Sequence, residues 1–167
     1  MRTIKVQLST RGIEKAIKEL KDYEKEIAEK TRRLVETLQA EGISVASAAL
    51  VNIRGDSTNA GIVKYDVNAN GDIVSAIIAL EGKDALFVEF GAGIVFNPVD
   101  HPWAGKLGYG PGTYPSEHPP NKGIFPGYWY YGGGKLSVGT EAAMPIYKAS
   151  ENARNTAIQR AMEIFRS

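Results

Sequence analysis

The sequence predicts an α+β fold in a single domain of 167 residues, and three patterns support this prediction. Apolar residues recur at helical spacing from residue 9 to about residue 50, and they alternate at strand spacing between residues 63 and 80. Helical spacing returns from Pro145 onwards. Between these regions, Gly91 to Lys135 follows neither period, so we treat it as a long loop insertion within the same domain.

The composition excludes several classes of site. Twenty basic and nineteen acidic residues give a net charge of +1, so no overall field would attract nucleic acid. The absence of cysteine excludes thiolate chemistry, cysteine-ligated zinc and disulfides. No apolar run approaches the roughly 20 residues of a membrane span, and the first residues do not resemble a signal peptide. We therefore expect a soluble protein, made in a cytoplasm, without a membrane partner.

The first fifty residues are expected to form a short strand and then helix. Residues Thr3 to Leu8 alternate between apolar and polar, which is typical of a half-buried strand. Ser9 and Thr10 can cap the helix that follows. Because nearly forty helical residues is long for a compact domain, we expect two consecutive helices with a break near Lys21 or Gly42. The apolar stripe consists of Ile13, Ile17, Leu20, Tyr23, Ile27, Leu34, Leu38 and Val45.

A β-hairpin is predicted next. Val63, Tyr65 and Val67 alternate with polar residues, and a second alternating run covers residues 73 to 80. Asn70-Gly71 between the two runs supplies the positive φ angles of a tight turn. The second run is apolar on both sides, so we expect it to lie inside the sheet, covered on each face.

The remaining elements frame the insertion. Ala85 to Phe90 is a third apolar run leading into it, and Leu136 to Val138 is a candidate strand leading out. Pro145 suits the first turn of a C-terminal helix, where its missing N–H costs nothing. That helix carries a stripe that is mostly alanine, so we expect it to pack flat across the strands. The stripe is Ile146, Ala149, Ala153, Ala157, Ala161 and Ile164.

The insertion is rich in aromatic residues. It also holds both tryptophans, both histidines and all prolines but one. Disordered segments are poor in aromatic residues, so we expect an ordered arm whose rings are buried against another molecule, as in an interface core. The expected subunit-interface residues are Phe96, Trp103, Tyr109, Tyr114, Phe125, Tyr128, Trp129, Tyr130 and Tyr131.

Candidate reactive groups are few. Asp100, His101, Glu117 and His118 gather metal-type ligands in the insertion, but their spacing matches no metal motif. No nucleophile elbow or phosphate-binding glycine motif is present. Glu89, within an apolar run, is expected to cap a backbone or pair with an arginine, and to be buried. We therefore predict no catalytic, metal, cofactor or nucleic-acid site and no enzymatic activity.

The order of parts resembles the gene-product-ten-like family of minor structural proteins of long-tailed bacteriophages. The resemblance rests on Glu89-Phe90-Gly91, on the pattern Ala143-x-Pro145-x-x-x-x-Ala149, and on an insertion that closes on Tyr128-Trp129-Tyr130-Tyr131. It spans most of the chain. It gives structural roles to Glu89, Gly91 and Pro145, and it implies a curved antiparallel sheet with N-terminal helices and a C-terminal helix packed on it.

The resemblance also implies a function. Members are tail-completion or head–tail joining proteins of the neck, and they form a ring, expected to be hexameric, at the end of the tail tube. The implied partners are other copies and other neck, tail-tube or sheath proteins, with nucleic acid passing at most through the ring lumen. The implied location is a virion or a headless bacteriocin-like particle made in the bacterial cytoplasm.

Two alternatives belong to other classes. A small metal-dependent hydrolase would use His101, His118 and nearby carboxylates, and stoichiometric metal in elemental analysis would favour it. A peptide-binding or glycan-binding module would be a stable monomer with aromatic rings lining an open groove. The sequence alone leaves these alternatives open.

Overall fold

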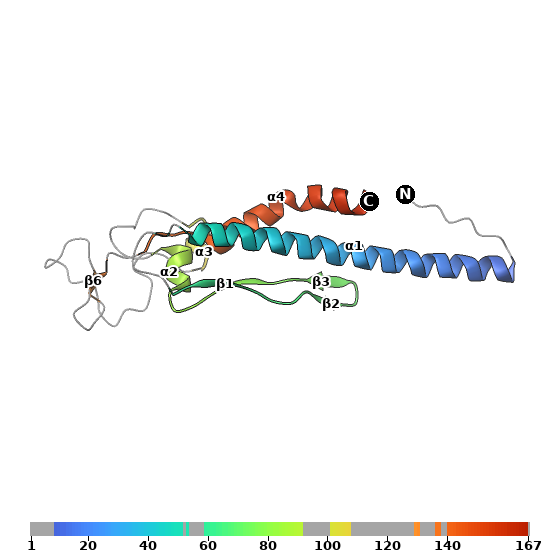
Figure 1. Cartoon of the computed structure of the whole chain (residues 1–167), viewed down its shortest axis with the longest axis horizontal. Coiled ribbons are helices and arrows are strands. Elements are labelled where there is room, and N and C mark those ends of the chain that lie inside the picture. The colour runs from blue at the N-terminus through green and yellow to red at the C-terminus, as the bar shows by residue number, and fades with distance from the viewer. Residues whose placement is uncertain are drawn as a thin grey trace.

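The computed structural model describes residues 9–51, 53, 59–91, 101–107, 129–130, 136–137 and 140–166. Figure 1 shows an elongated molecule in which one long helix has a second helix on one side and a β-hairpin on the other. Helices and antiparallel strands occur in one chain, which confirms the predicted α+β class. The predicted strand from Thr3 to Leu8 lies outside the described residues.

Helix α1 is continuous from Thr10 to Leu50. The side chain of Ser9 accepts a hydrogen bond from the backbone N–H of Gly12 at 3.2 Å, which confirms the predicted cap. The predicted division into two helices is wrong. No proline interrupts this stretch, and ion pairs at i,i+4 spacing, such as Lys15 with Glu19 and Arg32 with Glu36, support the exposed helix. Its 41 residues give a length of about 60 Å.

The hairpin is confirmed, but it contains a bulge. Strand β1 (Gly61–Lys64) pairs with β4 (Ile78–Glu81), and β2 (Asn68–Asn70) pairs with β3 (Ile73–Ser75), both antiparallel. Between the pairs Lys64↔Ile78 and Asn68↔Ser75, one strand has three residues and the other has two. One extra residue on one strand is the signature of a β-bulge, which bends and twists the hairpin.

The turn of the hairpin lies one residue later than predicted. Asn70 pairs with Ile73, so the two loop residues are Gly71 and Asp72. Gly71 has φ 58°, whereas Asp72 does not have a positive φ. Glycine at the first central position alone with positive φ is the pattern of a type II′ turn.

The prediction that the second strand lies inside a sheet is wrong. Each sheet among the described residues has two strands. Ile73 and Ile77 are 71% and 56% exposed, so the second apolar row of this strand faces away from the helices. The inner row includes Ile78, whose Cδ1 lies beside Gly42 of α1.

Helix α4 (Pro145–Arg166) packs mainly against α1 and only at its start against β4, so the prediction that it lies flat across the strands is wrong. Pro145 stands at the first helical position, as predicted. The three elements meet at Gly42, where an added Cβ would lie 2.6 Å from Ile78 Cδ1 and 3.7 Å from Ala149 Cβ. The small residues on α4 therefore allow it to approach helix α1 closely.

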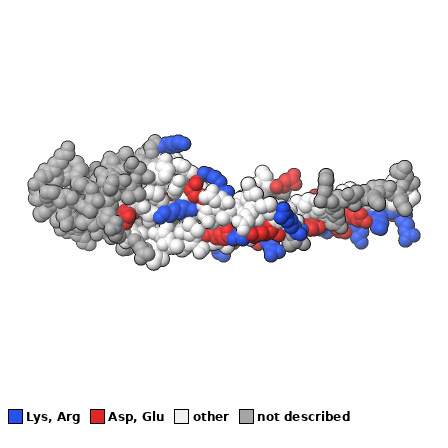
Figure 2. Space-filling model, turned by 90° about the horizontal axis from the view of Figure 1, so that it is seen from above, with Lys and Arg blue, Asp and Glu red and all other residues white. Residues whose placement is uncertain are grey.

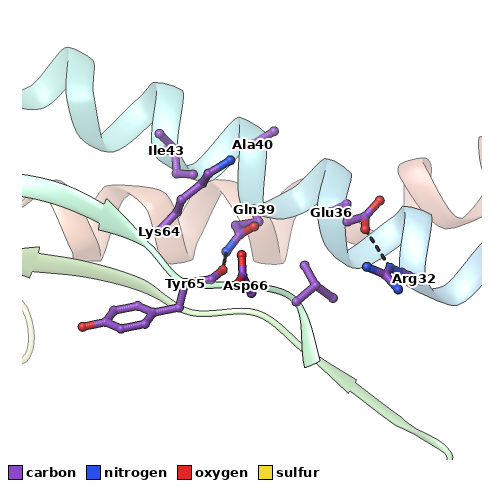
Figure 3. A pocket seen from close by; sticks show the side chains of 9 residues that line it. Arg32, Glu36, Gln39, Ala40, Ile43, Lys64, Tyr65 and Asp66 are labelled. Carbon is purple, nitrogen blue, oxygen red and sulfur yellow. Dashed lines mark hydrogen bonds and ion pairs between the residues drawn. The ribbon is translucent and has the colours of Figure 1, made fainter. Parts of the chain in front are cut away.

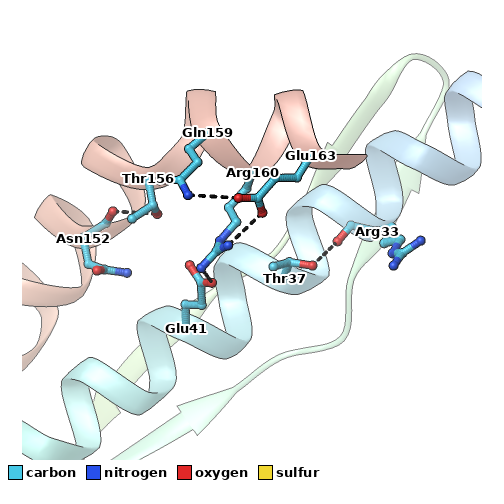
Figure 4. A network of polar contacts seen from close by, with 8 residues as sticks. All are labelled: Arg33, Thr37, Glu41, Asn152, Thr156, Gln159, Arg160 and Glu163. Carbon is cyan, nitrogen blue, oxygen red and sulfur yellow. Dashed lines mark hydrogen bonds and ion pairs between the residues drawn. The ribbon is translucent and has the colours of Figure 1, made fainter. Parts of the chain in front are cut away.

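A polar network also joins the two helices (Figure 4). Arg160 of α4 contacts Glu41 of α1 and Glu163 of its own helix, each at 2.7 Å. The hydrogen bond from Arg160 holds the pKa of Glu163 below its ordinary value. Because these groups are partly exposed, the network adds little stability. Its main effect is to orient α4 against α1. On the face drawn in Figure 2, basic and acidic side chains are interspersed along the molecule.

Gln39 attaches the bulge of the hairpin to α1. Its side-chain nitrogen donates to the carbonyl oxygen of Tyr65 at 2.8 Å (Figure 3) and to that of Ile77 at 3.0 Å. The Ile77 oxygen also accepts from the Tyr65 N–H at 3.1 Å. A bulge leaves ladder groups unpaired, and this one side chain compensates for that loss.

Replacing Gln39 by leucine is therefore expected to lower the free energy of unfolding by about 1–2 kcal/mol, because the Tyr65 carbonyl loses its donor. Urea denaturation followed by circular dichroism measures the change. Gln159→Leu is the control, since Gln159 bonds only to the exposed Glu163; we expect a change below about 0.5 kcal/mol there. Equal effects of the two variants would contradict this role for Gln39.

Candidate functional site

The most buried polar cluster of the described chain centres on Glu89. The apolar run from Ala85 to Phe90 forms a short helix, α2, and its last three residues are buried. Glu89 is 8% exposed. A carboxylate is costly to bury without partners, so the contacts of this side chain decide what the cluster does.

Glu89 caps the N-terminus of α4. Met144 precedes that helix, and its carbonyl accepts from the Lys148 N–H at 3.0 Å, which makes Met144 the N-cap residue. A methionine side chain cannot accept the next backbone N–H groups as serine or aspartate would. Instead the two carboxylate oxygens of Glu89 accept from the N–H groups of Ile146 and Tyr147, both at 2.9 Å. The predicted backbone cap is thus confirmed.

His101 is the second partner of Glu89. Its Nε2 lies 3.0 Å from Glu89 Oε1, and its Nδ1 accepts from the backbone N–H of Trp103 at 3.1 Å. Because Nδ1 accepts, the proton of the neutral ring must lie on Nε2, which donates to Glu89. Both ring nitrogens are therefore used in hydrogen bonds, and neither is left to bind a metal or accept a proton from a substrate.

Aromatic rings enclose the pair. The His101 ring is 4.5 Å from that of Phe90 and 5.2 Å from that of Tyr147, measured between centroids. The Trp103 ring packs edge-on against Tyr147 at 5.4 Å. Short helix α3 (Ala104–Leu107) follows. Trp103, predicted to lie in a subunit interface, is half-buried within its own protomer.

Gly91 joins this cluster to the insertion. Its φ is 76°, and an added Cβ would lie 3.1 Å from Ala142 Cβ and 3.2 Å from Ala142 N, so both conformation and space favour glycine. Beside it, the Val88 carbonyl accepts from the Ala143 N–H at 2.9 Å. The segment from Glu89 to Gly91 therefore meets the segment from Ala142 to Tyr147. We call this contact the Glu89 junction.

The remaining predicted interface residues are placed only in part. Trp129 and Tyr130 form strand β5, which pairs with β6 (Leu136–Ser137). Strand β6 lies within the candidate strand predicted from Leu136 to Val138. Figure 1 places β6 at the end of the molecule beyond α2. The positions outside the described residues are Phe96, Tyr109, Tyr114, Phe125, Tyr128 and Tyr131.

Metal-type ligands do not gather in the described part of the chain. No group of three His, Cys, Asp or Glu side chains that could hold an ion occurs there. Of the four candidate ligands, His101 is committed to the Glu89 junction, whereas Asp100, Glu117 and His118 lie outside the described residues. The hydrolase alternative therefore gains no support from His101.

A shallow groove lies between α1 and the hairpin (Figure 3). Its volume is about 550 Å³, and its lining includes Arg32, Glu36 and Lys64. Arg32 Nε is 2.9 Å from Glu36 Oε1, so these two charges neutralise each other. On the hairpin, the hydroxyl of Tyr65 donates to Glu81 at 2.5 Å, which raises the pKa of Tyr65. In Figure 3 the Tyr65 side chain points away from α1, so its hydroxyl does not face the groove.

No family model, curated protein or solved structure matches the chain. None of the helices that the structure describes is both long and apolar enough to cross a bilayer.

Proposed function

We propose that this protein is a structural component of a phage or a phage-derived particle. In this proposal it is a tail-completion or head–tail joining protein that assembles as a ring at the end of the tail tube. The observation that supports this most is the Glu89 junction. The two short motifs on which the family resemblance rests, Glu89-Phe90-Gly91 and the segment opening with Ala143, are in direct contact there.

The chemistry of the junction favours a structural role. Both oxygens of Glu89 and both ring nitrogens of His101 are engaged in bonds within the protomer. In these bonds the four atoms hold the start of α4 and the backbone at Trp103 in place. Here the groups join the start of the insertion to α2 and α4, so the arm leaves the body from a fixed base.

The arm from Gly91 to Lys135 is the proposed contact between subunits. Its many aromatic residues have the composition of an interface core, and head-to-tail contacts close into a ring where the rotation permits. Neighbouring copies in a hexameric ring and other neck, tail-tube or sheath proteins are the proposed partners. Charge of both signs along the body is compatible with contacts to proteins.

Replacing residues 96 to 131 by a short linker tests the proposal. We expect the full chain to form annular particles in negative-stain images and a large species in light scattering. The shortened chain should lose that species while retaining its helical circular dichroism, because α1 and α4 pack against each other outside the replaced segment. Lys83→Ala, in the exposed turn before α2, serves as a control that keeps the arm. Unchanged assembly after the replacement would contradict the proposal.

A further inference from the structure

The first half of α1 extends beyond the other elements. Arg160 contacts Glu41, and only six residues of α4 follow before it ends at Arg166. Six helical residues span about 9 Å, so α4 stops well before the start of α1, and Figure 1 shows α1 extending past the ends of α4 and the hairpin. We call residues 10–28 of α1 the overhang.

The overhang exposes an apolar stripe, in which Ala16 is the one described residue that is buried, at 7% exposed. Ile13, Ile17, Leu20 and Ile27 are 46%, 48%, 55% and 39% exposed. Ile13, Leu20 and Ile27 stand seven residues apart, and Leu34, the next in the series, is half-buried in the covered part of α1. The stripe therefore continues, beyond the end of α4, the face of α1 that packs against other elements. Apolar residues at steps of three and four residues form the face by which a helix packs, so the fitting partner is another helix.

The spacing of the stripe selects a second copy of the same helix. The positions 13, 17, 20, 23 and 27 advance by four, three, three and four residues, which reads the same in both directions. Position 23 is a tyrosine that is 36% exposed. An isologous contact requires that residue i meet residue j and that j meet i. An antiparallel pair centred on Leu20 meets this condition, because Ile13 then faces Ile27 of the partner subunit.

The charge balance of the overhang and the length of α1 beyond α4 both suit a second copy as the partner. The overhang carries five basic and five acidic residues, so two copies do not repel each other, and a strongly charged partner such as DNA is not favoured. In the centred register, Thr10 of the partner subunit lies opposite Lys30. Each overhang thus fills the length of α1 that α4 leaves uncovered.

We propose that two copies of this chain pair antiparallel through their overhangs, about a two-fold axis at Leu20. This contact is separate from the arm and does not depend on the proposed role in a phage particle. It adds a second self-association surface at the opposite end of the molecule from β6 (Figure 1).

Cysteine cross-linking of the full chain tests the pairing, because the natural sequence has no cysteine. Under mild oxidation, Leu20→Cys should form a disulfide-linked dimer on a denaturing gel, since a two-fold axis brings the two introduced thiols together. Lys18→Cys, on the opposite side of the helix, is the matched control and should remain monomeric on the gel. Equal cross-linking of the two variants, or none with Leu20→Cys, would overturn the proposal.

Mixtures of two cysteine variants distinguish the antiparallel pair from other segments that could cover the stripe. Ile13→Cys mixed with Ile27→Cys should cross-link, whereas either alone should not. Self-cross-linking of Ile13→Cys would show a parallel pair, and cross-linking of Leu20→Cys with Phe165→Cys would show α4 of another copy on the stripe; each result would overturn the antiparallel pair. Coverage by residues 1–8 of the same chain would leave every variant uncross-linked, which also overturns it. Because the gel reports only local contact, these outcomes are independent of the ring.

Discussion

Replacing Glu89 by alanine is expected to lower the free energy of unfolding by about 3–5 kcal/mol, because it leaves three N–H donors of the junction without an acceptor, at about 1–3 kcal/mol for each buried donor. The variant leaves the N–H groups of Ile146 and Tyr147 without their acceptor, and it leaves the donor of His101 unpaired. A helix N-terminus also loses a negative charge that its dipole favours.

Urea denaturation followed by far-ultraviolet circular dichroism measures this loss. Glu29→Ala, on the exposed surface of α1, is the matched control and should change the free energy by less than about 0.5 kcal/mol. Glu89→Gln should fall between, because its one oxygen can cap a backbone N–H while its amide nitrogen cannot. Hydrogen exchange should accelerate at the amides of Ile146 and Tyr147 in Glu89→Ala. A loss below about 1 kcal/mol would show that the cap is not the main role of Glu89.

Replacing Gly42 by leucine is expected to lower the free energy of unfolding by about 3 kcal/mol, the upper part of the range for an overpacked core. The glycine lies where α1, α4 and β4 meet, and even a methyl group there would lie 2.6 Å from Ile78 Cδ1. Leucine improves helix propensity by close to 1 kcal/mol over glycine, but its larger side chain must push the three elements apart. The steric term therefore exceeds the gain in propensity.

Two comparisons separate the steric effect from other effects of the substitution. Gly61→Leu is the control, since an added Cβ at Gly61 meets no atom within 4 Å, and we expect a change below about 1 kcal/mol. Gly42→Ala should be better tolerated when combined with Ile78→Val, which removes the methyl group that causes the clash. If Gly42→Ala has the same effect in both backgrounds, the close contact with Ile78 does not determine the outcome.

Local sequence determined those elements whose signals act between near neighbours. Ser9 begins α1, alternation and Gly71 make the hairpin, and Pro145 begins α4. Each of these rests on hydrogen bonds or backbone angles within a few residues, and so each could be derived without knowing the fold. The α+β class followed from the same periodicities.

The length of a helix and the covering of a strand face depend on more than the local pattern. The break expected in α1 does not occur, because a long helix needs only local hydrogen bonds and ion pairs to continue past the core. The second hairpin strand is apolar on both sides, yet Ile73 and Ile77 remain exposed. Apolar character shows that a side chain can be buried, but not which element is there to cover it.

Only the tertiary structure decided how the Glu89 junction is built. Glu89 and Tyr147 are 58 residues apart, and His101 reaches the same carboxylate from within the insertion. The sequence indicated that Glu89 needs a buried partner, because an isolated charge is costly to bury. It could not identify that partner, because nearly every residue has a backbone N–H and the sequence does not mark which one is free to donate. Such a donor becomes available only where a helix begins beside the carboxylate.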